Sequence, residues 1–135
     1  MSETPDPRLG LTVTHRRYVP YAHAHYGGDL VDGAYSLGLF GDVATEVAIR
    51  TDGDEGLLAG YSEVLFLGPV RAGDVLEATA EVVRVGRRSR ELRCTARVIA
   101  RAEPERGPSA ARLLDEPVTV VEAIATLVVP PPAVG

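Results

Sequence analysis

The spacing of apolar and polar positions changes along the chain and predicts one long helix. From Gly27 onward, apolar and small residues recur every three or four positions, which is typical of one face of a helix. We expect this helix to run from about Asp29 to Arg50, with Asp29 as its N-cap and residues 51–56, TDGDEG, as its stop. The expected buried face consists of Leu30, Gly33, Ala34, Leu37, Gly41, Ala44 and Ala48. Because most of these residues are small, we expect strands to approach the helix closely.

The rest of the chain has the pattern of β-strands. A first strand is expected within residues 8–18, and the later strands are expected at 57–67, 74–85, 89–102 and 118–129. The intervening segment 103–116 carries Pro and Gly and is expected to hold one helical turn at 110–114. One long helix followed by four strands predicts an α+β fold of the hotdog type. In this fold a five-stranded antiparallel sheet wraps around one long central helix.

Length and charge narrow the class of protein. The chain has 135 residues and a formal net charge of -5, which argues against nucleic acid as a partner. We expect a single domain at 8–130, a flexible leader at 1–7 and a flexible tail at 131–135. No apolar run approaches the roughly 20 residues of a membrane span, and the N-terminus lacks the features of a secretory signal. We therefore expect a cytoplasmic protein without a membrane partner.

The residue types present exclude several chemistries. The one cysteine, Cys94, excludes an internal disulfide, and its position in an alternating segment predicts that it lies in the core. The 14 basic residues are all arginine, which excludes lysine Schiff-base chemistry. No nucleophile elbow, P-loop or dinucleotide fingerprint occurs.

The first candidate site is the segment from His25 to Gly28, directly ahead of the expected helix. Backbone N–H groups at a helix N-terminus are unpaired, and glycine leaves them open to a ligand. The amides of Gly27 and Gly28 would suit the oxygen of a thioester carbonyl as it becomes negative. The same glycines also suit a simple turn from strand to helix.

The second candidate is a flank of the helix that carries Tyr35, Asp42 and Glu46. Asp42 and Glu46 are four residues apart and therefore neighbours, so one carboxylate can act as a base while the other stays protonated or binds an amine. Glu46 also precedes Arg50 by four residues, which is equally consistent with a surface ion pair on a solvated face.

Arginines and histidines give two further candidates. Arg87, Arg88 and Arg90 lie at an expected hairpin turn, where they would either bind phosphate groups or blunt a sheet edge. Of the three histidines, His25 is expected to act as an acid/base or orienting group, or to be structural. Because His15 and His23 bring no further ligand at a recognised spacing, no metal site is expected.

Several blocks together closely resemble the 3-aminobutyryl-CoA and β-alanyl-CoA ammonia lyases, a hotdog-fold family. These blocks are HYGGDLVDGAYSLGLFGDVATEVAIRTDGDEGL at 25–57, YSEVLFLGPVRAGD at 61–74, VGRRSRELRCTARVIA at 85–100 and EPV at 116–118. The resemblance extends to Pro130. It implies reversible addition of an amine to the β-carbon of an α,β-unsaturated acyl thioester, in an aza-Michael reaction. The thioester is carried by coenzyme A or by the phosphopantetheine of an acyl carrier protein, and no metal or redox cofactor is expected.

The resemblance also covers relatives in actinobacterial biosynthetic pathways that add glycine rather than ammonia. The chain departs from the ammonia lyases before His25, where it is more basic and aromatic. Arg16 or Arg17 would bind the carboxylate of an amino acid, which ammonia does not need. We therefore expect glycine as the amine, ahead of ammonia, in a pathway that makes a β-amino acid unit.

These expectations define one site and two alternatives. The residues expected to converge near the amides of Gly27 and Gly28 are His25, Asp42 and Glu46, with Tyr35 lining the pocket and Arg87, Arg88 or Arg90 near its mouth. Because hotdog protomers pair their sheets, a homo-oligomer is expected, at least a dimer and in larger assemblies a hexamer. The alternatives are a hotdog thioesterase, which would hydrolyse the acyl thioester, and a thioester-binding module without catalysis.

Overall fold

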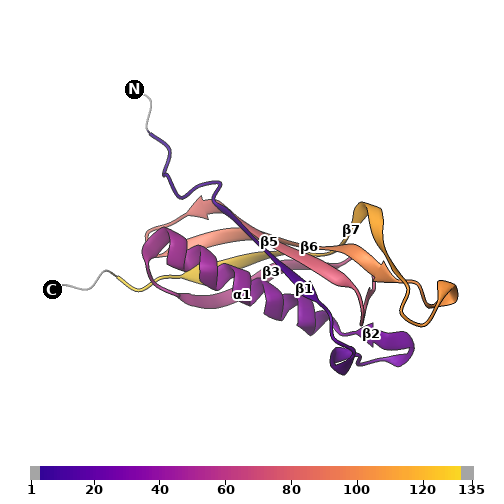
Figure 1. The fold of residues 1–135 in the computed structure, drawn as a ribbon. Helices are drawn as coiled ribbons and strands as arrows, with labels where there is room; N and C mark the ends of the chain where they lie inside the picture. The colour runs from indigo at the N-terminus through magenta and orange to yellow at the C-terminus, as the bar shows by residue number, and fades with distance from the viewer. Residues whose placement is uncertain (1–3, 132–135) are drawn as a thin grey trace.

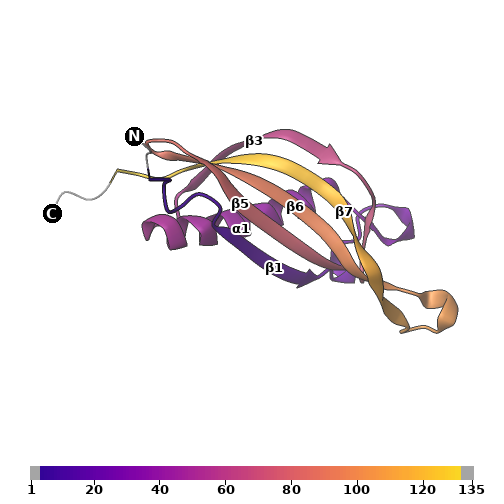
Figure 2. The same cartoon turned by 90° about the horizontal axis from the view of Figure 1, so that it is seen from above.

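The computed structural model describes residues 4–131, in which one helix lies against a single curved sheet (Figure 1). The helix α1 spans Gly33–Asp52. The sheet is antiparallel with the strand order β1-β5-β6-β7-β3. Its strands are β1 Thr12–Tyr18, β3 Leu57–Phe66, β5 Val75–Val85, β6 Ser89–Ala102 and β7 Ala111–Val128. The predicted hotdog fold is therefore confirmed, and Figure 2 shows β1 and β3 at opposite edges of the sheet.

The helix begins later than the sequence pattern suggests. The chain first forms two short 3-10 turns, η1 at Tyr21–His23 and η2 at Gly27–Asp29. A short strand β2, Leu30–Val31, then pairs with β4, Val70–Arg71, before the helix starts. The predicted N-cap Asp29 is wrong, because this residue has a φ of 61° inside the turn. Asp32 is the N-cap, and its side chain accepts a hydrogen bond from the backbone N–H of Tyr35.

The buried face of the helix also differs from the predicted stripe of small residues. The side chains that α1 buries are those of Ser36, Leu39, Phe40, Val43, Ala44, Val47 and Ala48. Of the predicted stripe within α1, only Ala44 and Ala48 are buried, whereas Ala34 is exposed. The concave face of the sheet requires large side chains to fill it, and Phe40 and the valines supply that volume. The prediction that small residues bring the strands close to the helix is therefore wrong for most of its length.

Two strand boundaries differ from the prediction. Residues 110–114 form no helical turn, because Arg112 and Leu113 pair in register with Arg101 and Ala100 of β6. β7 consequently begins at Ala111 and extends the β6–β7 hairpin beyond the helix (Figure 2). The first strand begins at Thr12 rather than at Arg8. Cys94 lies in the core, as predicted.

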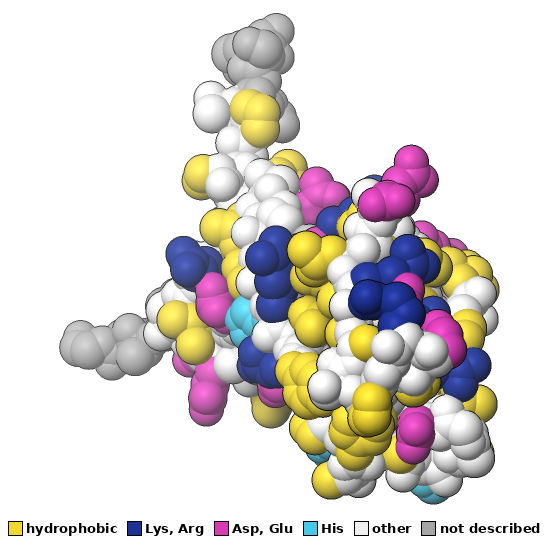
Figure 3. Space-filling view, turned by 45° about the vertical axis from the view of Figure 1, so that its right-hand side comes forward, with side chains coloured by type: hydrophobic (Ala, Val, Ile, Leu, Met, Phe, Trp, Pro, Cys, Tyr) yellow, Lys and Arg dark blue, Asp and Glu magenta, His cyan; other side chains and the backbone are white. Residues whose placement is uncertain are grey.

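The face that carries the tip of the β6–β7 hairpin shows arginine and acidic side chains close to one another (Figure 3). Glu103 pairs there with Arg106 and Arg112, next to the 3-10 turn η3 at Pro104–Arg106. Because arginine side chains are interspersed with acidic side chains here, this face is not a continuous basic surface. Within residues 4–131, no helix is both long enough and apolar enough to span a membrane. Residues 1–3 of the predicted leader and 132–135 of the predicted tail lie outside the described residues.

Candidate active site

A cavity of about 590 Å³ lies along the first half of α1 and brings several predicted site residues together. Its lining includes three predicted site residues, His25, Tyr35 and Asp42. The structure adds His23 and Asp32, which the sequence analysis did not select for this site. Two carboxylates, two imidazoles and a phenol thus line one space, which is a suitable arrangement for proton transfer.

The side chains that line this cavity lie around the N-terminus of α1. Asp32 uses one oxygen to cap α1, and its other oxygen lies 3.8 Å from Nδ1 of His25. The rings of His23 and Tyr35 are 4.8 Å apart. Burial raises the pKa of Tyr35, and the nearby positive charge of Arg17 opposes this shift in part. The phenol of Tyr35 therefore remains protonated near neutral pH and can donate a hydrogen bond into the cavity.

Glu46 lies one turn beyond Asp42 and is held by ion pairs rather than lining this cavity. One carboxylate oxygen is 2.8 Å from Nε2 of His15 in β1, and the other accepts a hydrogen bond of 2.8 Å from Arg50. The hydrogen bond with His15, followed by that from Arg50, lowers the pKa of Glu46. The ion pair expected from the spacing of Glu46 and Arg50 is thus present, and His15 extends it to the sheet.

Gly27 and Gly28 form a turn that is separate from the Asp42 cavity. The backbone N–H groups of His25 and Tyr26 close this turn by donating to the carbonyl of Leu30. Gly28 has a φ of 69° and its carbonyl accepts a hydrogen bond from Arg71. It lines a different cavity of about 580 Å³, so within one protomer the structure does not bring Gly28 and Asp42 together.

A further cavity of about 530 Å³ opens at the actual N-terminus of α1. It is lined by Gly33, Ala34 and Ser36 of the helix, and it shares His25 and Asp32 with the Asp42 cavity. As the first two residues of α1, Gly33 and Ala34 have backbone N–H groups without partners inside the helix. The ring of Phe66 packs directly over Gly33, where any larger residue would overlap it. This cavity therefore combines an apolar wall with hydrogen-bond donors at its mouth.

Arg16 and Arg17 lie on opposite faces of β1. Arg16 is the register partner of Glu77 and donates to its carboxylate over 3.1 Å, on the face turned away from the helix. Arg17 is the register partner of the buried Leu76 and shares the helix-facing side with His15. Its charge reaches Tyr35 of the Asp42 cavity. Of this pair, Arg17 is therefore the one on the same side of β1 as that cavity, although its side chain is exposed and does not line it.

The three arginines of the β5–β6 hairpin lie at the other end of the helix. Arg87, Arg88 and Arg90 line a cavity of about 640 Å³ beside Asp52, the last residue of α1. An α-helix of 20 residues is about 30 Å long, so within one protomer these arginines are remote from His25. The predicted placement of these arginines at the mouth of the His25 site is not found within one protomer.

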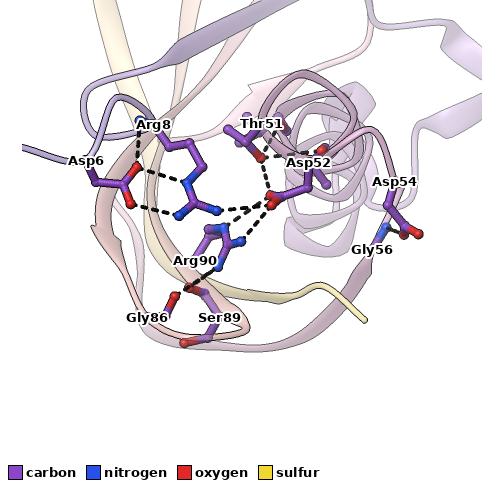
Figure 4. A network of polar contacts seen from close by, with 11 residues as sticks. Asp6, Arg8, Thr51, Asp52, Asp54, Gly56, Gly86, Ser89 and Arg90 are labelled. Atoms are coloured by element: carbon purple, nitrogen blue, oxygen red, sulfur yellow. Dashed lines mark hydrogen bonds and ion pairs between the residues drawn. The ribbon is translucent and has the colours of Figure 1, made fainter. Parts of the chain in front are cut away.

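Arg90 is a structural residue in this arrangement (Figure 4). It is 3% exposed and donates to both carboxylate oxygens of Asp52 and to the carbonyls of Gly86 and Ser89. Arg8 joins the same carboxylate and is itself held by Asp6. Arg87 and Arg88 remain exposed and form no ion pair with any of residues 4–131.

Known proteins share both this sequence and this fold. Residues 30–104 match the model of the thioesterase superfamily. The 3-aminobutyryl-CoA ammonia lyase of Acetoanaerobium sticklandii is 47% identical over 107 residues, which cover 79% of this chain and 85% of that protein. The chain belongs to the 3-aminobutyryl-CoA ammonia lyase family. This is a family of carbon–nitrogen lyases within the thioesterase superfamily, and the resemblance read from the sequence is confirmed.

Solved structures support the same assignment to the ammonia lyase family. The β-alanyl-CoA:ammonia lyase from Clostridium propionicum has a TM-score of 0.84 and 31% identity, and the match covers 90% of this chain and 86% of the other. A hexameric hotdog thioesterase of Campylobacter jejuni has a TM-score of 0.70 at 17% identity, over 84% of this chain and 79% of the other. The second similarity shows the shared fold alone.

Several residues become neighbours only through folding and have no local signal in the sequence. His15 was considered as a metal ligand, whereas its partner in the structure is Glu46, 31 residues away. Asp32, which was not predicted as the N-cap, takes that position in place of Asp29. In contrast, the face of β1 that carries Arg17 could be predicted from the sequence. Side chains alternate along a strand, so Arg17 lies on the same face as the apolar Val13.

Proposed function

We propose that this protein catalyses the reversible addition of an amine to the β-carbon of an α,β-unsaturated acyl thioester. Membership of the ammonia lyase family supports this reaction class. The observation that carries the proposal is the position of Asp42. Its carboxylate lines a cavity that adjoins the free N–H groups of Gly33 and Ala34 at the start of α1.

The chemistry follows from these two features. The thioester carbonyl accepts hydrogen bonds from the amides of Gly33 and Ala34, which makes the β-carbon electrophilic. These amides replace those of Gly27 and Gly28 as our first choice, because Gly28 faces a different cavity. Asp42 takes a proton from the ammonium group, and the neutral nitrogen attacks the β-carbon.

The second half of the addition completes the proton balance. The electrons of the carbon–carbon double bond move to the carbonyl oxygen and form an enolate, which the helix amides stabilise. A second group then returns a proton to the α-carbon and Asp42 releases its proton to solvent, so that N–H has been added across the double bond. His25 and Tyr35 line the same cavity and orient the reacting groups. The elimination of the amine is the reverse of these steps.

Glycine is proposed as the preferred amine, ahead of ammonia. The carboxylate of an amino acid requires a cation in a partly buried site. Arg17 lies on the helix-facing side of β1, and its charge reaches Tyr35 in the cavity that holds Asp42. Asp42 would bind the ammonium group and Arg17 the carboxylate of the same molecule.

A competition experiment tests both the reaction and the amine. Incubation with crotonyl-CoA and equal concentrations of ammonia and glycine is expected to give mainly the glycine adduct, identified by mass spectrometry. Exclusive formation of the 3-aminoacyl product would contradict the preference for glycine. Release of free thiol without an adduct would support the thioesterase alternative, which the superfamily match favours as second candidate. Thioester binding without either product would indicate a binding module.

Separate substitutions of Arg17 and Arg16 test whether Arg17 binds the carboxylate of the amine. Arg17→Gln is expected to raise the KM for glycine at least about tenfold, because a charge-assisted hydrogen bond is lost, and to leave the KM for ammonia unchanged. Arg16→Gln is the matched control, since Arg16 pairs with Glu77 on the opposite face. Equal effects of the two substitutions on both amines would contradict the assignment of Arg17.

The carrier of the acyl group is proposed to be coenzyme A or the phosphopantetheine of an acyl carrier protein. Arg87 and Arg88 remain the candidates for binding phosphate or an acidic carrier surface, because both are exposed at one hairpin. Arg90 is excluded from this role by its bonds to Asp52. Exchange of crotonyl-CoA for a crotonyl carrier protein in the same competition assay distinguishes the two carriers.

We propose a homo-oligomer because the two edge strands of the sheet differ in the polarity of their exposed side chains. The edge strand β3 exposes Leu57, Leu58, Leu65 and Phe66, whereas the edge strand β1 exposes mainly threonine and arginine. An exposed apolar edge strand favours pairing with a second copy. The thioesterase of Campylobacter jejuni, which shares this fold, is described as hexameric.

The mass in solution tests this assembly. The wild-type protein is expected to sediment as a dimer or a multiple of it, and Leu65→Arg is expected to yield monomers because it places a charge on the apolar edge. Thr12→Arg on the β1 edge serves as the matched control and should keep the wild-type mass. A monomeric wild-type protein at micromolar concentration would rule the assembly out.

A further inference from the structure

The cavity at the N-terminus of α1 contains a buried hydroxyl that no part of the proposed reaction has yet used. Ser36 is 1% exposed and lines this cavity together with the apolar Val31, Val70 and Val121. Two other hydroxyls of α1, those of Thr45 and Thr51, bond to the helix carbonyl four residues earlier. The hydroxyl of Ser36 makes no hydrogen bond to any of residues 4–131, and its oxygen is not fully enclosed, unlike the partnerless Nδ1 of His15. The hydroxyl therefore opens to the cavity and is available to a ligand there.

The direction of the side chain relates this hydroxyl to the helix N-terminus. Side chains of an α-helix lean toward the N-terminal end, so Ser36 leans toward the first turn. Gly33 and Ala34 form that turn, and both line the same cavity. This side-chain donor therefore lies near the two amides at the start of α1.

We propose that Ser36 is a catalytic residue whose hydroxyl donates a hydrogen bond to the thioester carbonyl oxygen, next to the amides of Gly33 and Ala34. The inference rests on the proposed function, because it assumes an acyl thioester as the ligand. The apolar residues of the cavity then surround the acyl chain, and Phe66 covers the opening above Gly33. In the complex the hydroxyl donates its hydrogen bond to the ligand instead of to solvent in the cavity.

The consequence for catalysis is an additional donor for the enolate oxygen. A preorganised donor stabilises the developing negative charge without reorganisation during the reaction. Loss of one such donor commonly costs about 10² to 10³ in rate, and two amides remain here, so we expect a loss of at least about tenfold in kcat for Ser36→Ala. The side chain of alanine fits wherever serine fits, so this substitution removes only the hydroxyl.

Infrared spectroscopy gives a readout that does not depend on turnover. Butyryl-CoA is a saturated thioester and cannot accept an amine, so it binds without reacting. Its carbonyl stretch is expected to shift to lower frequency when it binds to the wild-type protein, and to shift less in Ser36→Ala. Thr45→Ala is the matched control, because its hydroxyl is on the same helix and already bonds to Gly41.

The outcomes separate this inference from the proposed function. A smaller carbonyl shift in Ser36→Ala, with a normal shift in Thr45→Ala, supports the role of Ser36 even if no amine is added. A shift and a kcat equal to those of the wild-type protein would overturn it, even if amine addition is demonstrated. Failure of the wild-type protein to shift the carbonyl band of butyryl-CoA would overturn the inference as well.

Discussion

Asp42→Asn is expected to lower the rate of amine addition at least about 100-fold, the usual effect of removing a positioned proton-transfer group. Asparagine keeps the size of the side chain but cannot accept the proton of the ammonium group. The structure places this carboxylate in the cavity with His25 and Tyr35. The measurement is kcat with crotonyl-CoA and saturating amine.

Glu46→Gln is the matched variant for this experiment. Both oxygens of Glu46 are already bonded to His15 and Arg50, so we expect a smaller loss of turnover than for Asp42→Asn. A loss of about 100-fold in Glu46→Gln, with wild-type turnover in Asp42→Asn, would assign the proton transfer to Glu46 instead. Wild-type turnover in both variants would place both carboxylates on a solvated face without a catalytic role.

Arg90→Leu is expected to lower the free energy of unfolding by about 3 kcal/mol, at the lower end of the range for breaking a buried ion pair. The substitution leaves Asp52 with Arg8 and Thr51 as its remaining side-chain partners. Asp52 is the last residue of α1, where a negative charge is unfavourable to the helix dipole. Chemical denaturation of the two proteins measures the difference.

Arg88→Leu is the control for this stability prediction. Arg88 lies on the same hairpin but is exposed and unpaired within residues 4–131, so its replacement should change stability by less than about 0.5 kcal/mol. Equal stabilities of Arg90→Leu and Arg88→Leu would show that the contact with Asp52 contributes little to the fold.

The pH dependence of stability gives a second test of the same pair. Burial raises the pKa of Asp52, but hydrogen bonds from Arg90 and Thr51 outweigh burial, and the folded-state pKa is lowered. The contribution of this group is thus fully present above the unfolded pKa of about 3.9 and is lost as the pH falls through the folded value. The stability difference between wild type and Arg90→Leu should therefore shrink below about pH 4. A difference that is constant down to pH 2 would contradict this mechanism.

Features that depend on neighbours in the chain were predictable from the sequence. The helix, the β5–β6 hairpin and the proximity of Asp42, Glu46 and Arg50 follow from spacings of two to four residues. The family was also readable, because the blocks from His25 to Leu57 are long enough to be specific. The predicted N-cap Asp29 was wrong, because the chain first forms β2 and the helix begins after Asp32.

The placement of the site was not predictable in the same way. The sequence suggested that Gly27 and Gly28 lie at the helix start, but pairing of β2 with β4 inserts a strand between them and α1. The sheet rather than the helix determines that Phe40 and the valines face the core, because its concave surface must be filled.

The sequence by itself therefore determined the fold class and the family. The tertiary structure alone decided which groups share a cavity. His15 meets Glu46 across 31 residues and Arg90 meets Asp52 across 38, and neither pair has a local signal. The physical reason is that periodicity fixes the direction of a side chain relative to its own element, whereas the packing of elements fixes what that side chain contacts.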